Sequence, residues 1–71
     1  MMPLSMVKEG EPNTIQRVGG NEETKRFLEN LGFVTGAKVT VVSTVEGNII
    51  VNVKDSRIAI GKDMANKSMV S

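Results

Sequence analysis

The chain has 71 residues, which is enough for one small domain spanning residues 1–71. It contains no Cys, His, Trp or Tyr, so a disulfide framework, a His-dependent catalytic triad and the usual transition-metal ligands are excluded. Nine Lys and Arg against eight Asp and Glu leave a net charge of +1, and with two Phe as the only aromatic residues a nucleic-acid partner is not expected.

The first third of the chain predicts two short strands. Leu4–Val7 has the length and apolar character of one, and a loop rich in turn formers follows it. Thr14–Val18 is the second. Gly19 and Gly20 then interrupt the pattern, because two glycines leave the backbone unrestricted.

One amphipathic helix is predicted after the glycines. Asn21 is a good N-cap, and two Glu residues follow it in the first turn, where the helix dipole favours negative charge. Gly32 stands where a left-handed residue would end the helix. Apolar residues recur at helical spacing at Thr24, Phe27, Leu28 and Leu31.

From Lys38 onward the pattern alternates, which is typical of strands. A reversal at Glu46–Asn48 makes a hairpin, and a second turn at Lys54–Ser56 leads into Arg57–Ile60. A single helical turn at Lys62–Asn66 and a last strand at Ser68–Val70 complete the chain. The residues expected to face the core are Val39, Val41, Val45, Ile49, Val51, Val53, Ile58 and Ile60.

The predicted fold is mainly β. Five to six short strands without a second layer of helices bury their apolar faces by closing into a small barrel, with the helix over one open end. No stretch approaches the roughly 18 apolar residues of a membrane span, and the start of the chain is a poor signal peptide. A cytoplasmic protein without membrane insertion is therefore expected, and a weak homodimer through an exposed barrel edge is left open.

A motif begins in the predicted helix and continues through the strands that follow; it consists of Leu28-x-x-Leu31-Gly32-Phe33-x-x-Gly36-x-x-Val39-x-Val41-Val42, Gly47, Arg57-Ile58-Ala59-Ile60 and Ala65. This motif resembles the FeoA family, small proteins of bacterial ferrous-iron transport. The resemblance implies a barrel like that of Src-homology-3 domains, an SH3-like barrel, over nearly the whole chain. Ser68 departs from the family pattern, because an aliphatic residue usually stands there and a buried hydroxyl needs a partner.

The resemblance implies a non-enzymatic accessory protein that docks on the cytosolic GTP-hydrolysing domain of the FeoB permease. An alternative is a free-standing metal-responsive barrel, similar to the C-terminal domain of iron-dependent repressors, with weak transition-metal binding. No cofactor is expected in either case. No metal site is predicted, because isolated carboxylates suit Mg or Ca weakly; the six considered are Glu22, Glu23, Glu29, Glu46, Asp55 and Asp63.

Four residues form the predicted partner-binding surface, and each also has a structural interpretation. Phe33 either folds back onto Leu28 as a core residue or joins Val34 in an exposed patch. Arg57 is either solvated or an interface anchor. Met64 either fills the core or adds adaptable apolar surface.

Overall fold

The computed structural model describes residues 1–71 and shows six strands, two α-helices and one 3₁₀ helix. The prediction of a mainly β fold is confirmed. The elements, in chain order, are β1 (Met2–Pro3), η1 (Leu4–Met6), β2 (Pro12–Val18), α1 (Glu22–Asn30), β3 (Lys38–Val45), β4 (Asn48–Val53), β5 (Ser56–Gly61), α2 (Lys62–Lys67) and β6 (Ser68–Val70).

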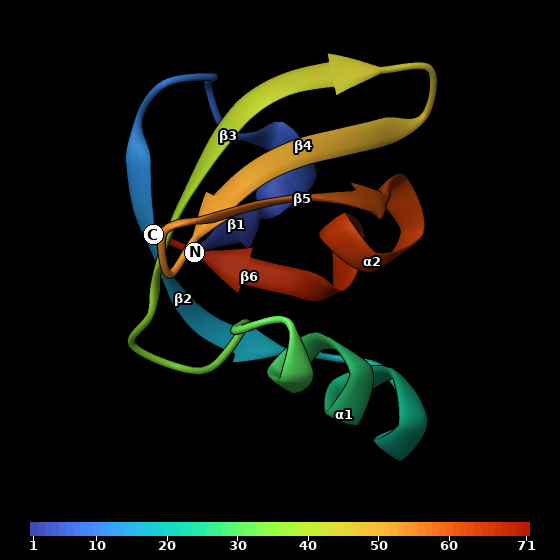
Figure 1. Cartoon of the computed structure of the whole chain (residues 1–71). Helices are drawn as coiled ribbons and strands as arrows, with labels where there is room; N and C mark the ends of the chain where they lie inside the picture. Colours follow the sequence, from blue (N-terminus) through green and yellow to red (C-terminus); the bar gives the residue numbers. More distant parts are fainter.

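All six strands form one antiparallel sheet in the order β1-β6-β2-β3-β4-β5 (Figure 1). β2 is shared between two partners. Its first half, from Pro12 to Thr14, pairs with β3, and its second half, from Ile15 to Val18, pairs with β6. The sheet curls around a single core, with α1 at one end and α2 between β5 and β6.

The start of the chain differs from its prediction, because Leu4–Val7 is not a strand. Pro3 is extended, and the chain then turns through η1, which the Val7 amide closes by donating to the Leu4 carbonyl at 3.4 Å. This turn places Leu4 in the core, where a straight strand would have left it at the sheet edge. The Ser5 hydroxyl donates to the Asn66 side chain and so ties η1 to α2.

Helix α1 begins and ends as the sequence predicts. The Asn21 side chain accepts the Thr24 amide at 2.8 Å, and Gly32 has φ +102°. The Phe33 amide donates to the Leu28 carbonyl and the Gly32 amide to the Glu29 carbonyl, both at 2.9 Å. This pair of bonds is the Schellman motif, which brings the residue after the glycine back against the last turn of the helix.

Phe27, in contrast, does not belong to the buried face of α1. Its side chain is 49 % exposed, whereas Leu28 is buried and Leu31 packs against the core at its margin. Thr24, Leu28 and Leu31 lie along one narrow stripe of the helix, and Phe27 lies beside it. A nine-residue helix over the end of a barrel buries only that stripe.

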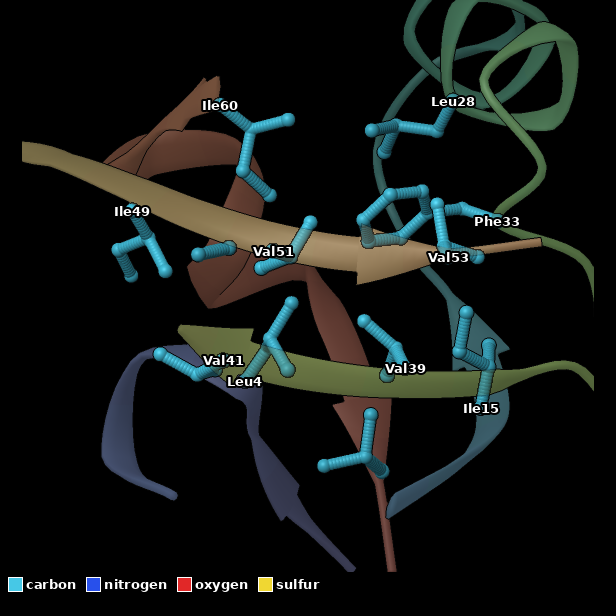
Figure 2. Close-up of a cluster of buried hydrophobic side chains, with 12 residues drawn as sticks. Leu4, Ile15, Leu28, Phe33, Val39, Val41, Ile49, Val51, Val53 and Ile60 are labelled. Atoms are coloured by element: carbon cyan, nitrogen blue, oxygen red, sulfur yellow. The ribbon is translucent and has the colours of Figure 1, made fainter. Parts of the chain in front are cut away.

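Twelve buried apolar side chains form the core, and every strand except β1 contributes to it. Figure 2 shows the Phe33 ring between Leu28 of α1 and Val53 of β4. The members are Leu4, Ile15, Leu28, Phe33, Val39, Val41, Ile49, Val51, Val53, Ile60, Ala65 and Val70.

A bulge in β3 explains why Val45 is not a core residue. Val41 lies opposite Val51, but Ser43, two residues on, lies opposite Ile50, so the register shifts by one. One extra residue reverses which face the following side chains occupy. Val45 is therefore 53 % exposed, and its predicted place in the core is wrong.

Ser68 begins the last strand, at a position where an aliphatic residue was expected. This side chain is fully buried, and its hydroxyl donates to the Met64 carbonyl at 3.1 Å. No buried side-chain polar atom in the structure lacks a hydrogen-bond partner. The bond joins the end of α2 to the start of β6, so the hydroxyl is accommodated by the helix before it.

Candidate docking surface

The side chain of Phe33 is not exposed at the surface. It is 0 % exposed, and the Schellman turn packs its ring over Leu28 and Val53. Of the two interpretations of Phe33, the core residue is confirmed, and the exposed patch shared with Val34 does not form. A partner could reach this residue only through its neighbours.

The other three predicted residues are accessible but lie apart. Val34 is half-buried in the turn after α1, Arg57 is exposed near the start of β5, and Met64 lies in α2, beyond the other end of that strand. Met64 packs partly against the core, as its structural interpretation requires. The structure therefore does not bring the four residues into one patch.

Arg57 lies in an open groove on the outer face of β3, β4 and β5, which we call the sheet groove. Its volume is about 720 Å³. Thr40 lies opposite Asn52, and Asn52 opposite Arg57, so these side chains form one row across three strands. The Arg57 Nε donates to Asn52 Oδ1 at 3.4 Å. The lining residues are Ala37, Lys38, Thr40, Asn52, Lys54, Asp55 and Arg57.

The two-residue turn at Lys54 and Asp55 forms one edge of the sheet groove. Both residues have positive φ, +51° and +62°, which is the backbone of a hairpin turn usually occupied by Asn and Gly. Lys54 also lies against the end of α1, because its Cδ would be 3.3 Å from a Cβ added at Gly32. The stem of Lys54 is thus packed while its ammonium stays in solvent.

A second groove of about 330 Å³, which we call the helix groove, lies between α1, the end of β2 and the turn after the helix. Val34 lines it, and Phe33 contributes to it without exposing its side chain. The remaining lining residues are Arg17, Val18, Lys25, Glu29 and Thr35.

Charge is unevenly divided between these grooves and the rest of the molecule. Five of the nine cations line them but only two of the eight anions, which leaves four cations and six anions elsewhere. The net charge of +1 does not reveal this asymmetry, because it sums the charges over the whole chain. The alternation of Lys38 and Lys54 with buried valines on paired strands was the signal that could have revealed part of it.

No group of three or more Asp or Glu side chains is placed to hold a metal ion. The chain also has neither His nor Cys, so the residues present do not fit a transition-metal centre.

No helix has the length and apolar character needed to cross a bilayer.

The sequence is similar to known proteins along nearly its whole length. A family model described as the FeoA domain matches residues 2–71. A protein of Methanocaldococcus jannaschii, which carries the name Fe(2+) transport protein A, is 34 % identical over 70 residues, covering 99 % of this chain and 85 % of the relative.

Solved structures share the fold. One described as an iron uptake regulatory protein (FeoA) has a TM-score of 0.90 at 31 % identity, covering 99 % of this chain and 93 % of that one. Stenotrophomonas maltophilia FeoA complexed with zinc has a TM-score of 0.85 at 27 % identity, covering 100 % and 91 %. It is described as a procaryotic SH3 domain protein, and the expectation of an SH3-like fold is confirmed.

A manganese-dependent transcriptional repressor also superposes, with a TM-score of 0.88 at 19 % identity over 97 % of this chain and 35 % of the repressor. At this identity the likeness concerns the fold alone. The family match covers almost every residue, and the identity to the relative extends over the same length. The chain therefore belongs to the FeoA family.

Proposed function

We propose that this chain is a non-enzymatic accessory protein of ferrous-iron transport, which acts in the cytosol by docking on the GTP-hydrolysing domain of a FeoB-type permease. The match to the FeoA domain over residues 2–71 carries the proposal. Two relatives add support, one named Fe(2+) transport protein A and one described as a candidate activating factor of ferrous-iron transport.

The accessible part of the predicted surface agrees with a docking role. Val34 and Arg57 each line a groove, and both are reachable from solvent. Arg combines a charge with a flat face and is over-represented at interface hot spots. Met64 lines neither groove and packs partly against the core, so it serves as the internal comparison.

An anaerobic titration tests the docking. Backbone amide shifts of isotope-labelled protein are recorded while the permease's cytosolic domain is added, with Fe(II) added in a separate tube. We expect the domain to shift amides near Val34 and Arg57 more than amides near Met64. If no amide shifts when the domain is present at near-millimolar concentration, docking on that domain is contradicted.

The metal-responsive alternative has two observations in its favour, the fold likeness to the manganese-dependent repressor and the zinc complex of Stenotrophomonas maltophilia FeoA. The ligand chemistry opposes it, because no carboxylate cluster and no imidazole or thiolate is present. The Fe(II) arm of the titration separates the two functions. Saturable shifts confined to one set of carboxylate residues would favour the regulatory barrel.

A further inference from the structure

The sheet groove holds positive charge that the protein itself does not neutralise. Lys38, Lys54 and Arg57 line it, with Asp55 as the one anion. Among these four side chains, only Arg57 makes a side-chain hydrogen bond, and its acceptor is the neutral amide of Asn52. Charges of one sign gathered in a concave surface raise the local concentration of an oppositely charged ligand.

The helix groove extends this positive surface beyond the turn at Val34–Ala37. Val34 and Thr35 line the helix groove and Ala37 lines the sheet groove, so the turn lies between them. The Ala37 amide donates to the Val34 carbonyl at 3.0 Å, which holds the turn in place. Arg17 and Lys25 outnumber Glu29 here, so the same sign of charge continues.

Resting on the docking proposed above, we infer that the partner contributes an acidic, extended segment that lies along the sheet groove and continues toward the helix groove. The cations of the sheet groove lie on β3, at the end of β4 and on β5, and neighbouring strands are about 4.8 Å apart. A single phosphate neutralises such cations only where their side chains converge on one point. A chain with several carboxylates can satisfy them together.

The lining of the sheet groove opposes other ligand classes. Ala37 is its one apolar residue, so an apolar ligand or an inserting lipid chain has little to contact. No aromatic side chain lines it, so there is no platform on which bases could stack. Charge and hydrogen bonding remain as the means of recognition, and both suit Asp and Glu side chains.

The groove is also preorganised for such a segment. The stem of Lys54 is packed beside Gly32, and the positive φ angles of Lys54 and Asp55 fix the turn that carries it. Arg57 is oriented by Asn52. Side chains that are already positioned lose less freedom when a ligand binds.

Two variants with the same net charge test the inference. The groove variant combines Lys38→Gln, Lys54→Gln and Arg57→Gln. The control variant combines Lys8→Gln, Arg26→Gln and Lys62→Gln, which are exposed residues outside both grooves. The probes are an eight-residue peptide of alternating Glu and Ser, the permease's cytosolic domain, phosphatidylglycerol vesicles and duplex DNA. Circular dichroism and thermal melting are used to check that both variants fold.

We expect the Glu-Ser peptide to shift the amides of Lys38, Thr40, Asn52 and Arg57 in the unsubstituted protein. The groove variant should weaken peptide binding about tenfold, as the loss of three partly exposed ion pairs predicts, and the control variant less than twofold. Raising the salt from low to physiological concentration should weaken binding as well. Equal losses in the two variants would overturn the inference, and so would vesicles or DNA shifting these amides when the peptide does not.

The permease domain separates this inference from the docking itself. If the domain binds the unsubstituted protein and the groove variant equally well, docking stands and the acidic segment is wrong. If the peptide binds in the groove and the domain does not bind, docking on that domain is wrong and the acidic segment belongs to another partner.

Discussion

Two hairpin turns of this molecule have the same backbone and opposite surroundings. Glu46 and Gly47 join β3 to β4, and Lys54 and Asp55 join β4 to β5; all four have positive φ. The first turn, which we call the free tip, has no side chain packed against it, since nothing lies within 4 Å of a Cβ added at Gly47. Its contact with α2 is a backbone bond, in which the Lys62 amide donates to the Gly47 carbonyl at 3.0 Å. The second lies against the end of α1 and forms an edge of the sheet groove.

The residues in the two turns differ accordingly. The free tip has a glycine at the second position, where positive φ is easily adopted, whereas the packed turn has Asp55 there. A turn of non-glycine residues in the left-handed region costs free energy and persists only where the surrounding structure imposes it. The comparison teaches that side-chain packing holds the groove edge, whereas the glycine of the free tip and one backbone bond from Lys62 hold the tip.

The largest expected effect is at the packing that supports the groove edge. Phe33→Ala should lower the free energy of unfolding by about 3–5 kcal/mol, because it leaves a cavity between Leu28 and Val53. A 71-residue chain has a total stability of about 4–10 kcal/mol, so this variant should lose a large part of its stability. Urea unfolding measures it, with Phe33→Leu as the milder variant. A loss below 1 kcal/mol for Phe33→Ala would show that the side chains around Phe33 are loosely packed.

Alanine substitutions at two glycines with positive φ, Gly47 and Gly32, distinguish the cost of backbone strain from the cost of a steric contact. Gly47→Ala should cost about 1 kcal/mol, the cost of a Cβ in the left-handed region alone. Gly32→Ala should cost about 2 kcal/mol, because its Cβ also meets Lys54. In a Lys54→Ala background the two costs should become equal. If Gly32→Ala stays more costly there, the difference comes from another source than Lys54.

Asp55→Gly brings the residue types of the packed turn closer to those of the free tip. It should raise the free energy of unfolding by about 0.5 kcal/mol, because relief of the left-handed strain slightly exceeds the greater chain entropy of glycine when unfolded. Thermal melting measures the change, and Asp55→Asn is the matched variant, since Asn also tolerates this backbone. A decrease in stability would mean that the packed turn is not strained.

The smallest effect is expected beside the free tip. Val45→Thr should change the free energy of unfolding by less than about 0.5 kcal/mol, because the side chain is mostly in solvent. The matched variant Val41→Thr lies before the bulge and should cost about 1–3 kcal/mol for a buried hydroxyl. Similar costs at both positions would contradict the change of face at the bulge.

Local patterns predicted much of this fold. The cap at Asn21, the left-handed Gly32 and the alternation of Ile49, Val51 and Val53 each depend on neighbours close in sequence, and each is confirmed. The exposure of Val45 could not be predicted in the same way, because a bulge depends on how two strands align. The burial of Leu4 could not be predicted from its neighbours either, because the residues that it joins in the core are distant in the sequence.

The candidate site was less predictable than the fold. Arg57 and Val34 could be named from exposure arguments, but their separation into two grooves depends on where the end of α1 packs. Phe33 was buried by the hydrogen bonds of the Schellman motif, which the sequence indicates only through Gly32. Lys38 and Lys54 come together through strand pairing, which composition does not reveal.

The bulge in β3 also divides the β3–β4 hairpin by local stability. Beyond it, the segment from Val45 to Asn48 leaves its side chains exposed, so its amides should exchange with deuterium through local opening. The amides of Val51 and Val53, under the core, should exchange only when the whole molecule unfolds. The tip lies at the opposite end of the hairpin from the sheet groove. An inserted fluorophore-binding loop at Glu46–Gly47 would therefore report on the protein while leaving the groove unoccupied and intact.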